Sequence, residues 1–217
     1  MNRTIAYTNA LLGLYLGLVL LSVVLIQQDA QFIEKGNKFH EYSYTEWAQQ
    51  IFALLSMFAC MLVGRKFEPL RPVAYLLAGG FGVIFIREMD HYSDFIYQGA
   101  WFPIALAALA VTAVAVYRHR AGFWSSVERF MSTASFGLMF AGGLSVFVFS
   151  RLFGSKNMWT TLFQVEQLAP RTPFKWAKNA VQEGSELFGY CLFLAAAIEL
   201  LAYAWLHLKK DAQNAEN

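Results

Sequence analysis

Six long runs of apolar residues follow one another along the chain, with short polar segments between them. The runs lie near residues 8–26, 47–64, 73–86, 101–117, 130–149 and 187–207. A helix needs about 20 apolar residues to cross roughly 30 Å of hydrocarbon. Strands of a membrane barrel would instead alternate apolar and polar positions, which these runs do not. The pattern predicts an all-α polytopic integral membrane protein, a bundle of six transmembrane helices.

Composition supports the same fold class. The 217 residues are 57% hydrophobic and only 15% charged, which is too apolar for a soluble domain. No polar stretch is long enough for a separate soluble domain, so we expect one transmembrane domain over residues 1–217. The longest loop, residues 151–182, contains Thr172-Pro173, a pair typical of a helix start. An interfacial helix from about residue 173 is therefore expected to run on into the sixth span.

Lysine and arginine residues concentrate after spans two, four and six, in segments 65–71, 118–129 and 209–210. Loops rich in these residues stay on the cytoplasmic side of a membrane. The distribution predicts a multi-pass protein of the inner (plasma) membrane with both termini cytoplasmic. Because topology explains the basic residues, they give no support to nucleic-acid binding. The expected partner is the lipid bilayer.

Polar side chains gather where spans two, three and six meet the outer face in this topology. The candidate metal ligands among them are Glu46, Glu88, Asp90, His91, Glu183 and Glu186. The supporting polar residues are Gln49, Gln50, Arg87, Arg151 and Tyr190. Carboxylates with one imidazole suit Mn, Fe or Zn, and oxygen-only sets suit Ca or Mg. The hypothesis is a carboxylate-rich site in the outer leaflet that binds a divalent cation, with Arg87 and Arg151 as balancing charges.

Two short motifs strengthen this hypothesis and also limit it. Glu88-x-x-His91 has the spacing that di-iron carboxylate bundles use, and Glu183-x-x-Glu186 would add two more carboxylates from another helix. Bundles of that kind carry two Glu-x-x-His motifs, whereas this chain has one. The identity of any metal cofactor therefore stays open, and no catalytic residue is identified.

Two alternatives come from other functional classes. In the first, the protein is a non-catalytic membrane subunit or scaffold with structural ion pairs. Glu46 would then belong to the first turn of a helix, and Arg87 would pair with Asp90. Glycine faces would pack within the bundle or dock a partner subunit or a second copy. These faces are Gly13 with Gly17, Gly79 with Gly80 and Gly82, and Gly137 with Ala141.

In the second alternative the protein is a membrane-embedded, metal-dependent lipid hydrolase, in which Asp90, His91 and a metal activate water.

Glu199 stands apart from these clusters. By the helical rise it lies about 12 Å from the cytoplasmic end of the sixth span, inside the hydrocarbon. An acid at that depth is a candidate functional group. The alternative is a protonated carboxyl group that forms a hydrogen bond with Ser132, Thr133 or Ser135 of span five.

Three of the sequence patterns together carry a resemblance to a known group of proteins. Glu46-Trp47 with Gln49 and Gln50, Arg87-Glu88-x-Asp90-His91, and Glu183-x-x-Glu186-Leu187 are the residues concerned. The combination resembles uncharacterised six-span bacterial inner-membrane proteins with Glu-Trp-x-Gln, Arg-Glu-x-Asp and Glu-x-x-Glu motifs. The resemblance covers most of the chain. It implies the six-helix fold and the grouping of these residues, and it brings no activity.

Overall fold

The computed structural model describes residues 3–31, 39, 43–95, 97–164 and 173–208. These residues form helices, and no strand occurs among them. Six helical segments are long and apolar enough to cross a membrane. They are Ala6–Gln31, Tyr44–Lys66, Glu68–Glu88, Trp101–Arg118, Ala134–Gly154 and Pro173–His207. The predicted all-α class with six transmembrane helices is confirmed.

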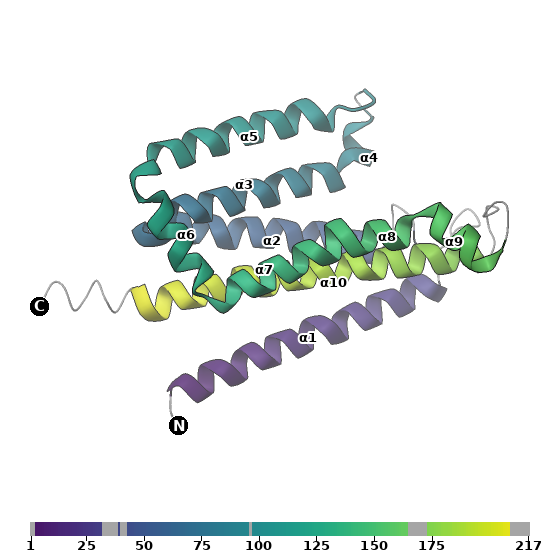
Figure 1. Cartoon of the computed structure of the whole chain (residues 1–217), viewed down its shortest axis with the longest axis horizontal. Helices are drawn as coiled ribbons and strands as arrows, with labels where there is room; N and C mark the ends of the chain where they lie inside the picture. Colours follow the sequence, from purple (N-terminus) through teal and green to yellow (C-terminus); the bar gives the residue numbers. More distant parts are fainter. Residues whose placement is uncertain (1–2, 32–38, 40–42, 96, 165–172, 209–217) are drawn as a thin grey trace, which may run out of the picture. The chain divides into compact units, whose positions relative to one another are not determined.

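The elements follow in the order α1 (Arg3–Gln31), α2 (Tyr44–Lys66), η1 (Glu68–Leu70), α3 (Arg71–Glu88), α4 (Asp90–Ser93), α5 (Trp101–Arg118), η2 (Arg120–Gly122), α6 (Phe123–Met131), α7 (Ala134–Leu144), η3 (Ser145–Phe149), α8 (Ser150–Gly154), α9 (Lys156–Phe163), α10 (Pro173–Tyr203) and η4 (Ala204–Leu208) (Figure 1). The helix expected from about residue 173 is found as α10, which runs unbroken from Pro173; Thr172 lies outside the described residues. Two details differ from the sequence pattern. The fifth span begins at Ala134, because Phe130 belongs to α6, and part of the expected loop forms α9.

The chain divides into two compact units. Unit 1 comprises Met1–Gln49 and Phe140–Leu192, and unit 2 comprises Gln50–Met139 and Phe193–Asn217. The division falls inside α2, α7 and α10, so both units contain a part of each of these helices. The expectation of a single transmembrane domain stays a prediction.

In unit 1 the start of α2 is fixed by an acid from the end of α1. The carboxylate of Asp29 is 2% exposed and accepts hydrogen bonds from the backbone N–H groups of Tyr44 (2.8 Å) and Thr45 (2.7 Å). It also accepts the hydroxyl of Thr45. The hydroxyl of Ser43 accepts the N–H of Glu46 at 3.2 Å. Since the first N–H groups of a helix have no partner within it, these side chains supply the missing acceptors.

Small residues let α10 approach the preceding helices of unit 1 closely. A Cβ at Gly189 would lie 2.5 Å from Val146 Cγ2 and 2.9 Å from the carbonyl oxygen of Gly142. The hydroxyl of Ser145 donates to the carbonyl oxygen of Ser185 at 2.7 Å, close to this contact. Glycine at position 189 is therefore needed for the packing of α10 against α7 and η3.

In unit 2, α3 lies beside α5 (Figure 1). A Cβ at Gly79 would come within 2.0 Å of the Thr112 hydroxyl, so this glycine permits the close approach of the two helices. An apolar core forms around the end of α2, from Val63, Phe67, Leu70, Val73, Ala74, Phe130, Leu200 and Ala204. The hydroxyl of Ser126 accepts the backbone N–H of Val73 at 3.4 Å, which ties α6 to the first turn of α3.

The glycine faces expected from the sequence differ in what they do. Gly79 and Gly82 contact neighbouring helices, whereas a Cβ at Gly13, Gly17, Gly80 or Gly137 would meet no atom within 4 Å. Within their own unit these four glycines make no close helix contact among the described residues, and their packing within the bundle stays a prediction. Docking of a partner subunit or a second copy on them stays a prediction.

We expect Asp29→Ala to lower the free energy of unfolding by about 1–3 kcal/mol, because the N–H groups at the start of α2 lose their acceptor. The midpoint of thermal unfolding in detergent measures the effect. Asp94→Ala is the matched control, since the exposed Asp94 accepts one hydrogen bond, from Gly99 N at 2.8 Å. Its loss should stay within about 0.5 kcal/mol. Equal losses in the two variants would contradict the capping role.

We expect Gly189→Ala to destabilise the protein by about 1–3 kcal/mol, because the new methyl group overlaps Val146 and a backbone carbonyl that cannot turn away. Gly137→Ala is the control, since open space surrounds that position. It should be neutral or slightly stabilising, because alanine favours a helix over glycine. The same unfolding assay compares the two. A neutral Gly189→Ala would show that α10 does not pack as described.

Candidate functional site

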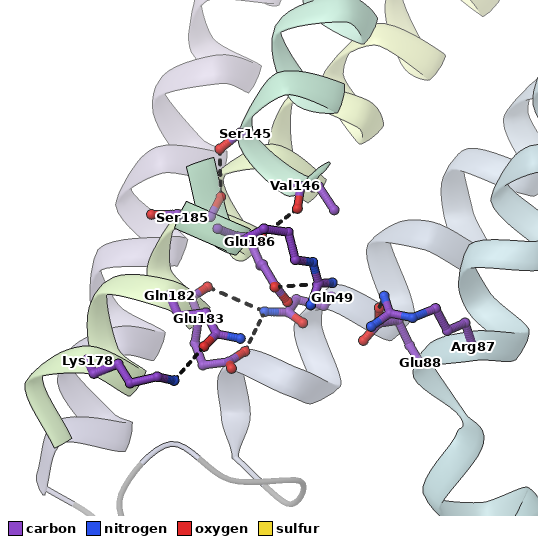
Figure 2. Close-up of polar contacts among 12 residues, drawn as sticks. Gln49, Arg87, Glu88, Ser145, Val146, Lys178, Gln182, Glu183, Ser185 and Glu186 are labelled. Carbon is purple, nitrogen blue, oxygen red and sulfur yellow. Dashed lines mark hydrogen bonds and ion pairs between the residues drawn. The ribbon is translucent and has the colours of Figure 1, made fainter. Parts of the chain in front are cut away.

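The centre of the candidate site is the fully buried side chain of Gln49, on the second turn of α2. Its amide nitrogen lies 3.4 Å from the carbonyl oxygen of Glu183 and 3.4 Å from the Oε2 atom of the same residue (Figure 2). The opposite amide orientation would place Gln49 Oε1 against the Glu183 carboxylate. The Gln49 amide nitrogen, and not its oxygen, is therefore assigned to the side that faces the Glu183 carboxylate.

Glu186 follows Glu183 one turn further along α10, which places the two side chains on neighbouring positions of one helix face. Its side chain is 7% exposed, and Oε1 lies 3.6 Å from a guanidinium nitrogen of Arg151 in α8. The Arg151 side chain is 47% exposed, so the guanidinium reaches a buried acid from the surface of the unit. At this distance the contact is an ion pair without a short hydrogen bond.

Two buried oxygen atoms of this cluster lack a hydrogen-bond donor. Within the described residues, neither Gln49 Oε1 nor Glu186 Oε1 has a hydrogen-bond partner. Buried acceptors in folded proteins nearly always have one, and an exception calls for an explanation such as an ion or an ordered water. We name the residues Gln49, Glu183 and Glu186 the oxygen cluster.

The neighbouring positions of α10 carry amide and cationic groups. Lys178 Nζ donates to Gln182 Oε1 at 2.9 Å (Figure 2). The Gln182 side chain packs over Gly154, where a Cβ would lie 2.8 Å from Oε1. Lys178 also lies within electrostatic range of Glu183 and Glu186. The two carboxylates of the oxygen cluster are therefore close to two cationic groups, Arg151 and Lys178.

The acids at the end of span three belong to unit 2 and have local contacts there. Arg87 forms an ion pair with Glu88 at 3.2 Å, whereas the sequence pointed to Asp90 as its partner. The reason is that α3 ends at Glu88, and Met89 leaves the helical conformation with φ −91° and ψ 13°. Asp90 then starts α4. Gln50 donates to the backbone carbonyl of Glu88 at 3.2 Å.

The helix end also affects the expected Glu-x-x-His motif. Glu88 is the last residue of α3 and His91 belongs to α4, so the two do not occupy successive turns of one continuous helix. The candidate ligands are divided equally between the units: Glu46, Glu183 and Glu186 in unit 1, and Glu88, Asp90 and His91 in unit 2. Among the described residues, no group of three or more His, Cys, Asp or Glu side chains is placed to hold a metal ion. A site that contains all these ligands stays a prediction.

Other sequence expectations have definite places in the structure. Tyr190 is fully buried in α10, and Glu199 is 5% exposed in the same helix. The Ser135 hydroxyl has no hydrogen-bond partner among the described residues, so the expected bond between Glu199 and Ser135 is not formed. The hydroxyls of Ser132 and Thr133 donate to carbonyl oxygens three residues earlier in the chain.

Sequence reasoning missed Asp29, which it did not include among the functional or structural acids. The available signal was Ser43-Tyr44-Thr45-Glu46, which has the capping-box pattern of a helix start. The first backbone N–H groups of such a helix need more acceptors than the capping box supplies.

No protein-family model, curated protein or solved structure matches the chain.

We expect Arg151 and Glu186 to be energetically coupled, because each compensates the charge of the other at the edge of the oxygen cluster. A double-mutant cycle with Arg151→Gln and Glu186→Gln should give a coupling free energy of about 0.5–1 kcal/mol, the lower part of the usual range, because water screens Arg151. Unfolding of the four proteins in detergent gives the value. Additive losses would contradict the ion pair.

Proposed function

We propose that this multi-pass membrane protein binds a hard divalent cation at the oxygen cluster. The observation that carries the proposal is the pair of buried acceptor atoms, Gln49 Oε1 and Glu186 Oε1, without a hydrogen-bond donor among the described residues. A cation held between such oxygens would satisfy both at once. In the proposed topology both termini are cytoplasmic in an inner membrane, and the oxygen cluster lies in the outer leaflet.

The donor set favours particular cations. Glu183 and Glu186 supply carboxylate oxygens and Gln49 supplies an amide oxygen, so unit 1 offers oxygen ligands only. Ca²⁺ and Mg²⁺ prefer such ligands, and Mg²⁺ is often held by one or two carboxylates while it keeps several waters. Zn²⁺ and Fe²⁺ favour nitrogen or sulfur ligands, which the cluster lacks. The proposed cation is therefore Mg²⁺ or Ca²⁺.

The guanidinium of Arg151 has a defined role in this proposal. Two carboxylates and one guanidinium leave a local charge of about −1 before Lys178 is counted. Arg151 lies 3.6 Å from Glu186 Oε1, close enough to balance the negative charge of this carboxylate. The distance is too long for a short hydrogen bond, so the guanidinium does not occupy the hydrogen-bonding positions of this oxygen. Arg151 would thus balance the charge of the acid when the site is empty and move outward when a cation binds.

A second candidate is a non-catalytic subunit whose acids are purely structural. The ion pairs of Arg151 with Glu186 and of Arg87 with Glu88 favour it. The capping position of Glu46 favours it as well. The lipid-hydrolase alternative stays a prediction.

Thermal unfolding of the detergent-purified protein separates the two candidates. Titration with MgCl₂ and with CaCl₂ should stabilise the wild type, by about 2.7 kcal/mol when the free cation is 100 times its dissociation constant. Gln49→Leu should remove the stabilisation, because it deletes the amide oxygen from the cluster. Gln50→Leu is the matched control, since this neighbouring amide contacts the Glu88 backbone and not the cluster. It should respond to the cation as the wild type does.

Elemental analysis after dialysis completes the test. We expect near-stoichiometric Mg or Ca in the wild type and in Gln50→Leu, and a loss of the metal in Gln49→Leu. A wild type without cation-dependent stabilisation and without bound metal would overturn the proposal. It would favour the structural interpretation of the ion pairs.

A further inference from the structure

Unit 2 contains an apolar cavity among α2, α3 and α5, with a volume of about 410 Å³. This volume lies in the usual range of small-molecule sites, about 300–1,000 Å³. Its walls include Met57, Met61, Gly82, Ala108 and Val111. The cavity is independent of the oxygen cluster, all of whose residues belong to unit 1.

The sequence explains why space remains there. Gly79 and Thr112 bring α3 and α5 together, and small side chains then line the seam beside this contact, from Ala78 and Gly82 on α3 to Ala108 on α5. A Cβ at Gly82 would reach only to ordinary contact with Met57 Sδ, at 3.4 Å. Methionine side chains are flexible and adapt to an apolar guest.

A single arginine lines the cavity at the end of α2. The Arg65 side chain is exposed, and within the described part of the chain it forms no hydrogen bond or ion pair. Arg120 lines the neighbouring cavity of about 490 Å³. It differs from Arg65 because its side chain already has contacts within the protein. It donates to the Tyr117 carbonyl at 3.3 Å and lies 4.1 Å above the Tyr117 ring.

The length of the cavity fits one leaflet of a bilayer. Arg65 and Met57 are eight residues apart on α2, or about 12 Å by the helical rise. Half of the hydrocarbon thickness is about 15 Å. The cavity thus extends from a guanidinium at the helix end through most of one leaflet. A ligand with a phosphate at one end and a hydrocarbon chain at the other complements both features, since arginine binds phosphate through paired N–H donors.

We propose that this cavity binds an anionic phospholipid of the surrounding bilayer, with one acyl chain between α2, α3 and α5 and the phosphate on Arg65. The guanidinium supplies charge recognition, and the apolar walls supply the contact area for the chain. The site is a lipid-binding site of unit 2, separate from the proposed cation site.

Native mass spectrometry of the delipidated, detergent-purified protein tests this proposal by titration with dioleoyl phosphatidylglycerol. We expect one tightly bound lipid in the wild type. Arg65→Gln should weaken its binding about tenfold or more, because the charge-assisted bonds to the phosphate are lost. Gly82→Leu should weaken it by occlusion of the acyl-chain space. Arg118→Gln is the matched control, because it removes a charge from the same end of unit 2 without lining the cavity.

Equal weakening by Arg65→Gln and Arg118→Gln would overturn the proposal, since it would indicate general attraction of anionic lipid to a basic surface. Unchanged binding in Arg65→Gln would overturn it as well. Arg65 is exposed at the helix end, so this variant keeps the fold and gives an answer even if Gly82→Leu does not fold. Thermal unfolding of each variant verifies that the fold is kept.

Discussion

The hydrogen bonds of Gln49 to Glu183 are the interaction on which the site in unit 1 depends. Both distances are 3.4 Å, and the glutamine is fully buried. Inside a membrane protein no bulk water can satisfy a polar group, so its partners must come from the protein or from a ligand. The amide nitrogen finds its partner on α10, and the amide oxygen does not. That imbalance is the observation that supports the proposed cation site.

The same constraint explains the polar contacts around the cluster. Asp29 supplies the acceptors that the first turn of α2 needs and so fixes where that helix begins. Gly189 lets α10 approach η3 and α7 closely, which sets the position of Glu186 relative to Arg151 within unit 1. Capping and close packing therefore determine where the side chains of the oxygen cluster lie within unit 1. In unit 2 the constraint is met differently, by the ion pair of Arg87 with Glu88 and by a largely apolar interior.

The apolar runs were sufficient to predict the fold class, because a bilayer imposes helix length and composition directly. The Thr172-Pro173 pair predicted the start of α10 at Pro173, since proline is tolerated in the first turn of a helix and not in its interior. The apolar runs did not predict the end of α3 at Glu88, because Met89 is a good helix former and only its backbone conformation reveals the break. For the same reason the partner of Arg87 was assigned to Asp90, which an unbroken helix would have placed one turn away.

The candidate site could be predicted only in part. Helical spacing grouped Gln49 with Glu46, and Glu183 with Glu186, because both pairs lie on one helix. It could not distinguish the capping position of Glu46 from the buried position of Gln49, since burial depends on contacts with distant segments of the chain. The role of Asp29 was equally hidden, because it depends on a contact 15 residues away.

The central claim is that a cation occupies the space between Gln49 Oε1 and Glu186 Oε1. Anomalous X-ray diffraction from crystals of the purified protein, in which Mn²⁺ replaces the proposed Mg²⁺ or Ca²⁺, tests it most directly. We predict a single anomalous peak at about 2.0–2.6 Å from both oxygens, within the range for hard cations on oxygen ligands. A map without such a peak, with the Arg151 guanidinium in short hydrogen bonds to Glu186 Oε1, would contradict the claim.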